Sequence, residues 1–432
     1  MAPSPVHFSG SEGQGPPIAL ISVHGDPAID IGKEEAGGQN VYVRQVGKAL
    51  AKLGWRVDMF TRKTDSQAPA QVQHSPRCRT IRLKAGPEGF VPRDRLFQHL
   101  PEFVQGFKAW QGQNHYRLIH TNYWLSGWVG HQLRLDSALP WVHTYHSLGA
   151  VKYEATDDLP PIAETRLRVE RDVLEQADCV VATSPQEQVH MRHLVSTQGN
   201  IEVIPCGTNV DHFQVVPKTD AKLALGMPIE DQVVLYVGRF DPRKGIETLI
   251  RAFGELDVLT HPHLRLVIAG GSDPTQADGA ERRRLEAIVQ ELDLGDRVCF
   301  AGRVSDHDLP YYYAAADLCV VPSHYEPFGL VAIEAMACGT PVLASAVGGL
   351  NFSVVSEETG LLVPARDVQA FAVGIKRILT QPDWAQQLQS KAARRVRQHF
   401  SWVGVANQLG DLYGRLIQSH PLVTSPAAAR RI

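Results

Sequence analysis

Short apolar runs alternate with helical patterns along most of the chain. In the first half, the runs that read as buried strands are residues 18–23, 57–60, 118–121, 140–144, 179–183 and 201–204. In the second half they are residues 233–237, 264–269, 298–301, 318–321, 342–344 and 360–363. Apolar residues recur at helical spacing over 43–53, 162–176, 246–256, 281–292, 309–315, 328–338 and 368–379. Such alternation predicts parallel sheets with helices on both faces.

The two series of elements predict an α/β protein with two doubly wound, Rossmann-like domains and an interdomain cleft. We place the first domain at residues 1–213 and the second at 214–400, and we interpret the polar stretch 205–231 as a linker. A further helix is predicted at 401–418, followed by a small, basic and flexible tail at 419–432. In open sheets of this kind, ligands bind beyond the carboxyl ends of the strands, so we expect the functional residues there.

Composition excludes several classes of protein. The 432 residues carry a formal net charge of −3 without a polybasic or polyacidic bias, which argues against nucleic acid or an anionic membrane as the main partner. No run approaches the roughly 18 apolar residues of a membrane span, and the start of the chain lacks a signal-peptide pattern. The six cysteines are scattered, which indicates neither a zinc site nor a disulfide framework. We therefore expect a cytoplasmic protein that acts on small molecules.

The stretch from His324 to Pro341 is the most unusual part of the sequence. Between Phe328 and Cys338 almost every residue is small or apolar, which predicts a buried helix. Yet Glu326 and Glu334 lie eight residues apart in this stretch, a spacing that on a helix lets both face one cleft. A buried carboxylate costs free energy unless a partner binds it. The two glutamates are either ordinary paired acids or part of a ligand site.

Two loops suit a bound phosphate. Residues 238–245 follow the first strand of the second series and carry Arg239 and Lys244, two cations that suit a diphosphate leaving group. Gly270-Gly271 ends the next strand, which lets a ligand approach the backbone. In the first half, Gly37-Gly38 opens a helix, where free N–H groups favour an anion, although no G-x-G-x-x-G fingerprint is present. An exposed basic loop and a plain turn are the alternatives.

Polar residues also follow two strands of the first series. Asn122 and Tyr123 follow one strand, and His146 follows its neighbour. The basic residues of the next segment are Lys152, Arg166, Arg168 and Arg171, with Arg93 as a further candidate. We hypothesise a pocket for a phosphorylated small molecule, because arginine forks bind phosphate oxygens. A solvated helix face and a structural histidine are the alternatives.

No motif in the sequence has metal-ligand spacing. There is no Asp-x-Asp at a strand end and no suitable cluster of histidine and aspartate. If a diphosphate leaves here, protein cations and helix ends must neutralise its charge. We therefore expect no cofactor and no strict metal requirement.

Together, these motifs resemble the retaining, two-domain nucleotide-sugar glycosyltransferases of the GT-B architecture, in the large family that includes sucrose and sucrose-phosphate synthases. The resemblance covers roughly residues 18–415. The matching residues are Gly37-Gly38-Gln39, His146, Arg239 with Lys244, and the E-x7-E pair Glu326 and Glu334. The resemblance implies that the helix 401–418 crosses back onto the first domain.

The resemblance also implies roles for these residues. The implied donor-binding residues are Gly38, Gln39, Arg239, Lys244, Gly271, Val304, Glu326, Phe328, Gly329, Leu330 and Glu334. The implied catalytic residues are His146, Arg239, Lys244 and Glu326, and the acceptor-binding residues are Asn122, Tyr123, Lys152, Arg166, Arg168 and Arg93. Glu334 would bind the ribose and Glu326 the donor sugar, while Val304 would lie near the nucleobase.

The acceptor side is similar to that of sucrose-phosphate synthases, on the residues 146–150 with Lys152, Arg166 and Arg168. This implies retaining transfer of glucose from UDP-glucose to fructose 6-phosphate, giving sucrose 6-phosphate and UDP. Residues 38–44 and 338–341 resemble the inositol-phosphate N-acetylglucosaminyltransferases at least as much. A sucrose synthase-like enzyme and a catalytically silent, nucleotide-sugar-binding regulatory protein are further alternatives. The base of the donor and the oligomeric state stay open.

Overall fold

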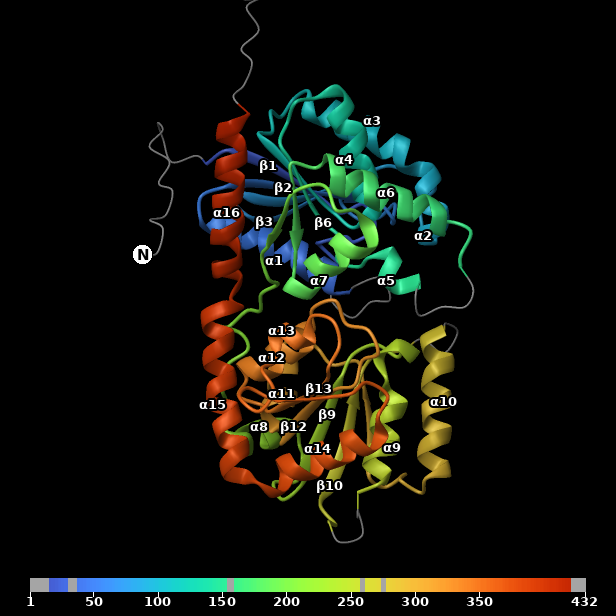
Figure 1. Ribbon diagram of the computed structural model, residues 1–432, viewed down its shortest axis with the longest axis vertical. Coiled ribbons are helices and arrows are strands. Elements are labelled where there is room, and N and C mark those ends of the chain that lie inside the picture. Colours follow the sequence, from blue (N-terminus) through green and yellow to red (C-terminus); the bar gives the residue numbers. More distant parts are fainter. Residues whose placement is uncertain (1–14, 30–36, 154–158, 257–260, 273–276, 421–432) are drawn as a thin grey trace, which may run out of the picture.

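The computed structural model describes residues 15–29, 37–153, 159–256, 261–272 and 277–420. Each half of the chain folds around its own sheet, and Figure 1 shows the two halves one above the other. The predicted α/β class with two doubly wound units is confirmed. The part of the predicted tail beyond residue 420 lies outside the described residues.

The first sheet has the strand order β3-β4-β2-β1-β5-β6-β7-β8. Its strands are β1 (Pro17–Ile21), β2 (Arg56–Arg62), β3 (Gln71–Ser75), β4 (Cys78–Leu83), β5 (Leu118–Asn122), β6 (Trp141–Thr144), β7 (Cys179–Ala182) and β8 (Ile201–Val203). All neighbours pair in parallel except β3 and β4 at one edge, which are antiparallel. The order reverses at β1, so the carboxyl ends of β1 and β5 flank the switch point where such sheets bind ligands.

The second sheet has the order β11-β10-β9-β12-β13-β14 and is parallel throughout. Its strands are β9 (Gln232–Val237), β10 (Leu264–Ala269), β11 (Val298–Gly302), β12 (Leu318–Val321), β13 (Val342–Ser345) and β14 (Leu361–Val363). This is the 3-2-1-4-5-6 order of nucleotide-binding sheets, with the switch point between β9 and β12. The strands are almost wholly apolar because helices cover both faces.

Helices cover both sheets. Those of the first half are α1 (Gly38–Lys52), α2 (Arg93–Leu96), η1 (Phe97–His99), α3 (Leu100–Gln111), α4 (Trp124–Asp136), α5 (Gly149–Tyr153), α6 (Ala163–Gln176), α7 (Pro185–His190) and η2 (Met191–Val195). Those of the second half are α8 (Lys218–Ala224), η3 (Pro242–Lys244), α9 (Ile246–Gly254), α10 (Ala277–Glu291), α11 (Leu309–Ala315), α12 (Leu330–Ala337), α13 (Leu350–Ser353), α14 (Val368–Thr380), α15 (Pro382–His399) and α16 (Trp402–Ser419).

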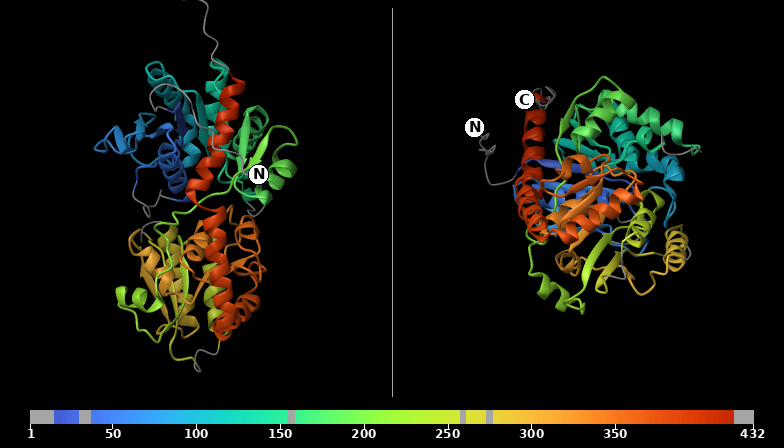
Figure 2. Two further views of the ribbon diagram at one scale, coloured as in Figure 1. Left: turned by 90° about the vertical axis from the view of Figure 1, so that its left-hand side faces the viewer. Right: turned by 60° about the horizontal axis from the view of Figure 1, so that its bottom comes forward.

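The chain passes between the halves twice, and the two passages touch. The Thr208 N–H donates to the Phe400 carbonyl at 2.6 Å, and Thr208 forms a β-bridge with Ser401. Beyond this point α16 runs along the first half, while α15 lies along the second (Figure 2). Trp402 packs on Tyr42 of α1, with 5.7 Å between ring centroids. The last helix therefore belongs to the core of the first half.

Several details differ from the prediction, which also lacked strand β4 and the long helix α15. The supposed linker 205–231 contains α8, which packs against α11 because Ala221 and Ala315 bury their methyl groups together. The edge strand β3 was not predicted, since its residues alternate between exposed and partly buried positions without an apolar run. Helix α12 begins at Leu330 and not at Phe328, because Gly329 adopts a left-handed conformation with φ 89° that ends the preceding loop.

Candidate active site at the boundary of the two halves

Two loops of the second half meet beyond the switch point of its sheet. The loop after β9 contains η3, and the loop after β12 leads into α12. The His324 N–H donates to the Arg243 carbonyl at 2.8 Å, so the two loops are joined by their backbones. A Cβ atom at Gly245 would lie 2.0 Å from the Pro322 carbonyl oxygen, which explains the glycine there. The predicted donor residues of both loops are thereby placed side by side.

Lys244 and Glu326 form an ion pair across these loops. The Lys244 Nζ lies 2.5 Å from the Glu326 Oε2, which also accepts from the Ser323 hydroxyl at 3.2 Å. The two side chains are 27% and 14% exposed, so their charges remain close to solvent. Arg239 is exposed, and no carboxylate forms an ion pair with it among the described residues. Arg243 of the same loop pairs with Asp241, so the loop offers two paired cations and, within the described residues, one without an ion pair, Arg239.

Glu326 lies before α12 and not on it, which corrects the helical-spacing argument for the two glutamates. The Gly349 N–H donates to the Glu326 carbonyl at 2.9 Å and fixes the backbone there. Within the described part of the chain, no acceptor was found for the N–H groups of Phe328, Gly329 and Leu330. Such free donors at the start of a helix suit negatively polarised oxygens of a ligand. The Phe328 ring itself is buried against Phe400.

Glu334 lies in α12, apart from Glu326. Its carboxylate accepts a hydrogen bond from the Tyr313 hydroxyl at 2.9 Å. Burial raises the pKa of Glu334 to about 7, because the hydrogen bond from Tyr313 does not compensate for lost hydration, and Asp306 adds repulsion. A group that donates hydrogen bonds to the carboxylate would favour its charged form. The diol of a ribose is such a group.

Two further predicted positions flank the neighbouring strand β10. The Gly270 N–H donates to the Gly302 carbonyl at 2.9 Å, and a Cβ atom at Gly270 would lie 2.1 Å from the Gly238 carbonyl oxygen. Gly271 follows, with the Arg303 side chain 3.2 Å from where its Cβ atom would be. Val304 is partly buried against the apolar core. No contact between these positions and Glu334 is recorded among the described residues.

The first half reaches the donor side through its glycine loop. A Cβ atom at Gly38 would lie 3.3 Å from the Leu330 Cδ1, so the starts of α1 and α12 are close neighbours. The Gln39 side chain donates to the Ser22 hydroxyl at 3.0 Å and to the Asn122 carbonyl at 3.4 Å. The first turn of α1, which carries Gln39, is thus fixed to the ends of β1 and β5. Here the two halves approach each other closely.

His146 lies at the end of β6 and is neutral. Its Nε2 lies 2.8 Å from the Asn122 Oδ1, and the Asn122 amide nitrogen donates to the Ile21 and His120 carbonyls. Because this fixes the orientation of the amide, Nε2 of His146 carries the proton. Burial lowers the pKa of His146 to about 3. The imidazole therefore serves as a polar group and not as an acid at neutral pH.

The backbone of both strand ends is strained. His146 has φ 60°, and Tyr123 has φ 74° with ψ 155°. Such positive φ values are rare for residues with bulky side chains and cost about 1–3 kcal/mol each. Residues held in this way cluster at functional sites. The strain supports a functional role at this edge of the first sheet.

Arg166 of α6 is held by a buried ion pair. Its Nε donates to the Glu170 Oε1 at 2.7 Å, and the two residues are 2% and 0% exposed. The Gly149 N–H also donates to Glu170. The terminal nitrogens of Arg166 reach the Ser147 carbonyl at 2.7 Å and the Tyr123 hydroxyl at 3.4 Å. The guanidinium is therefore aimed at the strand ends that carry Tyr123 and His146.

Three other cations surround Arg166. The Arg93 guanidinium lies 5.9 Å from the centre of the Tyr123 ring, and the Arg166 guanidinium lies 5.2 Å from it. The pKa of Lys152 is lowered by burial and by the positive charges of Arg166, Arg243 and Arg93. Arg243 comes from η3 of the second half, where it pairs with Asp241. We call Arg93, Lys152 and Arg166 the cation cluster.

Arg168 does not belong to this cluster, contrary to the prediction. Two positions along a helix correspond to a rotation of about 200°, so Arg168 lies on the opposite face of α6 from Arg166. Arg166 is buried, whereas Arg168 is exposed. The sequence spacing placed both arginines in one segment, but the helix separates them. Arg171 is exposed as well.

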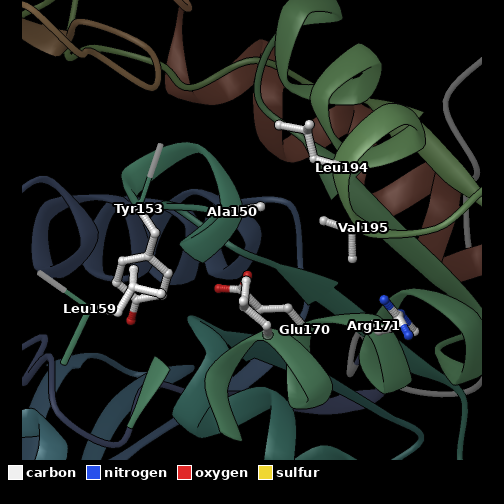
Figure 3. Close-up of a pocket in the computed structure, with 8 residues that line it drawn as sticks. Ala150, Tyr153, Leu159, Glu170, Arg171, Leu194 and Val195 are labelled. Carbon is white, nitrogen blue, oxygen red and sulfur yellow. The ribbon is translucent and has the colours of Figure 1, made fainter. Parts of the chain in front are cut away.

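Figure 3 shows a cavity of the first half, whose volume is about 320 Å³. It is lined by Ala150, Tyr153, Leu159, Leu167, Glu170, Arg171, Leu194 and Val195. Glu170 forms part of its wall and pairs with Arg166 on the other side. Of the basic residues that the sequence suggested for a phosphate pocket, Arg171 lines this cavity, whereas Arg93, Lys152, Arg166 and Arg168 do not.

No group of three or more histidine, cysteine, aspartate and glutamate side chains among the described residues is placed to hold a metal ion. No described helix is long and apolar enough to cross a membrane.

Known families match both halves of the chain. Residues 37–207 match the glycosyl transferase 4-like domain, and residues 218–395 match the group 1 glycosyl transferases. D-inositol 3-phosphate glycosyltransferase of Kineococcus radiotolerans is 37% identical, over 93% of this chain and 95% of the relative. The chain belongs to the group 1 glycosyl transferases. A second relative of the same name, from Acidothermus cellulolyticus, is 38% identical over 96% of this chain and 93% of its own length.

Solved structures agree with this family. Sucrose-phosphate synthase from Thermosynechococcus elongatus is 57% identical, with a TM-score of 0.87, and the match covers 94% of this chain and all of that one. HepE of Anabaena, crystallised with UDP and glucose, has a TM-score of 0.73 and is 22% identical, over 92% of this chain and 99% of HepE. The second match shows the fold alone. The group 1 glycosyl transferase is thus an enzyme with the two-domain GT-B fold.

Several residues of the site were missed by the sequence analysis. They are His24, Ser323, Tyr313 and Arg243. Ser323 and Arg243 lie in the same loops as predicted residues. Their position near Glu326 and Lys244 in the sequence could therefore have identified them. Tyr313 and His24 are distant in sequence from the residues they accompany. Only the folded chain brings them to the site.

Proposed function

We propose that this glycosyl transferase transfers glucose from UDP-glucose to fructose 6-phosphate and releases sucrose 6-phosphate and UDP. The observation that carries the proposal is the 57% identity to a sucrose-phosphate synthase over the whole of that chain. The relatives named for inositol phosphate reach 37% and 38% over similar lengths. The cation cluster, which provides charge for a phosphorylated acceptor, supports the same assignment.

The donor is assigned to the second half. Glu334, with its hydrogen bond from Tyr313, is proposed to accept hydrogen bonds from the ribose hydroxyls. Glu326 and the free N–H groups at the start of α12 are proposed to bind the hydroxyls of the transferred sugar. Lys244 and Arg239 then face the diphosphate, whose negative charge grows as the sugar–phosphate bond breaks. Val304 is proposed to lie near the nucleobase. Gly271 has no side chain and is proposed to let the donor approach the backbone at the end of β10.

The acceptor phosphate is assigned to Arg93, Lys152 and Arg166. A phosphate monoester carries nearly two negative charges at neutral pH. Arg166 is aligned by Glu170 before any ligand binds, which reduces the entropy lost on binding. Burial lowers the pKa of Lys152, and the neighbouring cations Arg166, Arg243 and Arg93 lower it further; a bound phosphate would offset that repulsion. The cluster therefore binds a dianion better than a neutral sugar.

We propose that the reaction retains the anomeric configuration and proceeds by attack on the face that the leaving group departs from. The acceptor hydroxyl forms a bond to the anomeric carbon as the bond to the UDP oxygen breaks. The hydroxyl proton passes to that departing phosphate oxygen, which serves as the base. His146 is neutral and is proposed to hydrogen bond a hydroxyl of the transferred sugar, not to move a proton. Arg239 and Lys244 neutralise the released diphosphate.

A second candidate is transfer of N-acetylglucosamine to an inositol phosphate. The curated relatives named above favour it, and it uses the same phosphate-binding logic. A third reading, transfer to unphosphorylated fructose, is disfavoured by the cation cluster. The candidates differ in donor sugar and acceptor, so a product assay separates them.

The test is a crossed product assay with the purified chain. UDP-, ADP- and GDP-glucose and UDP-N-acetylglucosamine are each combined with fructose, fructose 6-phosphate and D-inositol 3-phosphate, and the products are identified by mass spectrometry and NMR. We expect sucrose 6-phosphate from UDP-glucose and fructose 6-phosphate. Product only from UDP-N-acetylglucosamine and the inositol phosphate would overturn the proposal.

We also propose that the reaction does not strictly require a metal ion, and activity after EDTA treatment tests this. Arg239, Lys244 and the free N–H groups are proposed to carry the neutralisation that a metal supplies elsewhere. We expect most of the activity to survive EDTA treatment. Complete loss that magnesium restores would contradict this part of the proposal.

A further inference from the structure

Tyr42 of α1 lies between His146 and the place where the chain passes from one half to the other. Its side chain is buried, and its ring meets the ring of His146 edge-on, with 4.7 Å between centroids and 72° between the ring planes. Aromatic rings prefer this edge-to-face arrangement. His146 itself is only partly buried, which leaves part of the residue accessible. Tyr42 therefore supports a proposed catalytic side chain from within the core.

The backbone of His146 needs such support. With φ 60° it lies in the left-handed region, which is unfavourable for a residue with a bulky side chain. A strained conformation persists only where the surrounding structure fixes it. The hydrogen bond between Nε2 of His146 and Asn122, 2.8 Å long, fixes one atom of the ring. The Tyr42 ring supplies a further contact, which restricts rotation of the imidazole about that hydrogen bond.

Tyr42 is in turn supported by the first residue of α16. The Trp402 ring lies against it, with 5.7 Å between centroids and 74° between the ring planes. The Trp402 N–H donates to the Thr208 carbonyl at 3.3 Å, in the other passage of the chain. A Cβ atom at Gly207 would lie 2.9 Å from the Trp402 ring, so glycine allows the two passages to approach. On this side, the Tyr42 ring moves away from His146 only if α16 moves as well.

The same passage of the chain also reaches the donor side. The Phe400 carbonyl accepts from the Thr208 N–H at 2.6 Å, and the Phe400 ring packs on Phe328, with 5.7 Å between centroids. Phe328 lies two residues before the start of α12, where the transferred sugar is proposed to bind. Figure 1 shows α1 and α16 in the upper half of the molecule and α12 in the lower half. His146 and the donor loop are therefore joined through residues 400–402.

We propose that Tyr42 is a positioning residue for His146, whose imidazole it keeps in the orientation that meets the transferred sugar. The proposal rests on the proposed function, because it uses the role assigned to His146 there. Tyr42 itself contacts neither substrate and moves no proton. A change in the angle of the imidazole lengthens its hydrogen bond to the sugar, which slows the reaction without weakening binding of the acceptor.

The test removes the Tyr42 ring and compares the result with a control of similar burial. Y42M fills much of the space of the ring with a flexible apolar chain, whereas Y42F keeps the ring and both ring contacts. Phe107→Leu is the control, because Phe107 is fully buried in a separate cluster of the first half, with its ring 4.8 Å from that of Phe60. Each substitution is also made in an H146A background.

We expect Y42M to lower kcat about tenfold, while the KM for fructose 6-phosphate changes by less than about twofold. Y42F should behave like the wild type, and Phe107→Leu should lower Tm without lowering kcat. In the H146A background Y42M should have no further effect on kcat, because Tyr42 acts only through His146. An equal loss from Y42M with and without His146, or equal losses in Y42M and Y42F, would overturn the proposal.

A second readout does not depend on turnover. Histidine labelled with carbon-13 at Cε1 gives an NMR signal for each imidazole, and H146A identifies the signal of His146. We expect Y42M to shift this signal and Phe107→Leu to leave it in place. Trp402→Leu should shift it as well, because it leaves Tyr42 without its support. An unchanged His146 signal in Y42M would overturn the proposal. If Y42M does not fold, an unchanged signal in Trp402→Leu overturns it.

Failure of the proposed function is distinguishable from failure of this inference. If the wild-type chain makes its product from UDP-N-acetylglucosamine and D-inositol 3-phosphate, the proposed function fails. The kinetics of the Tyr42 variants are then measured with those substrates. The NMR measurement decides in either case whether Tyr42 controls the orientation of His146.

Discussion

The donor side and the acceptor side of the site hold their charges in different ways. On the donor side, Lys244 pairs directly with Glu326, and both remain near solvent. On the acceptor side, Arg166 pairs with a carboxylate that is fully buried, and Lys152 and Arg93 add further positive charge. Lys244 thus starts paired, and this pair must rearrange when a diphosphate binds, while Arg239 has no ion pair among the described residues. The acceptor side keeps an excess of positive charge in a fixed arrangement.

This difference in charge arrangement predicts which kinetic constant depends on each side. A redistributing pair matches a charge that develops during the reaction, so its loss should appear mainly in kcat. A pre-aligned cluster matches a charge already present on the acceptor, so its loss should appear mainly in the acceptor KM. Loss of the buried carboxylate of Glu170 should mainly lower the free energy of unfolding. Variants on each side can break or sharpen this distinction.

The largest effect is expected from Glu170→Ala. It leaves the buried Arg166 guanidinium without its partner, which costs about 3–5 kcal/mol in the free energy of unfolding. Chemical denaturation measures this loss. Glu164→Ala, at an exposed position of the same helix, is the matched control and should change the free energy by no more than about 0.5 kcal/mol. A loss below about 1 kcal/mol for Glu170→Ala would contradict the buried ion pair.

Next come Arg239→Ala and Lys244→Ala, each of which should lower kcat by about 10²- to 10³-fold, roughly 3 kcal/mol. Steady-state kinetics at saturating substrates tests this. The two should differ in thermal stability: Lys244→Ala strips Glu326 of its partner and lowers Tm, whereas Arg239 has no ion pair to lose among the described residues. Arg251→Ala, on the surface of α9, is the control. Near-normal turnover in both variants would refute the diphosphate assignment.

Arg93→Ala and Lys152→Ala should each raise the KM for fructose 6-phosphate about tenfold, because each removes a charge-assisted hydrogen bond worth about 1.5–3 kcal/mol. The KM for UDP-glucose should stay within twofold. Arg168→Ala is the matched control from the opposite face of α6 and should leave both constants unchanged. If Arg168→Ala impaired acceptor use as strongly as Arg93→Ala, the choice of residues in the cation cluster would be wrong.

The smallest effect is a pH dependence of donor binding. Because the Glu334 carboxylate has a pKa of about 7, it is charged above that pH and neutral below it. The ionised form accepts hydrogen bonds from the ribose, so UDP-glucose should bind more weakly as pH falls from 8 to 6, up to about tenfold. Calorimetry over this range measures it, and Glu334→Gln should abolish the dependence. A flat profile in the wild type would mean that Glu334 does not contact the donor.

The fold was predictable because parallel strands buried on both faces are continuous apolar runs. Elements without such runs were missed. The edge strand β3 is half-exposed and therefore lacks an apolar run, and α8 lies in a polar stretch of the sequence. The long helix α15 was also missed, since its buried positions are mostly occupied by alanine. The local sequence pattern indicates which positions are buried, but it does not indicate which other helix or strand buries them.

The proximity of the two loops that carry the predicted donor residues was predictable, because each loop follows the end of one strand of the same parallel sheet. The acceptor residues come from α2, α5 and α6, which only the tertiary structure assembles. Arg166 and Arg168 look equivalent in the sequence, but their directions on the helix separate them. Tyr42 was not predicted as a site residue, and its contact with His146 is visible only in the folded chain. Position around a helix and contacts between distant segments are properties that spacing alone does not supply.

The central claim is that this glycosyl transferase uses fructose 6-phosphate as its acceptor and binds the phosphate at the cation cluster. Its most direct test is a competition in which fructose, fructose 6-phosphate and D-inositol 3-phosphate are present together at equal concentration with radiolabelled UDP-glucose. We predict that nearly all of the label appears in sucrose 6-phosphate, and that Arg93→Ala and Lys152→Ala reduce this preference over fructose. Label mainly in an inositol phosphate product or in free sucrose would contradict the account.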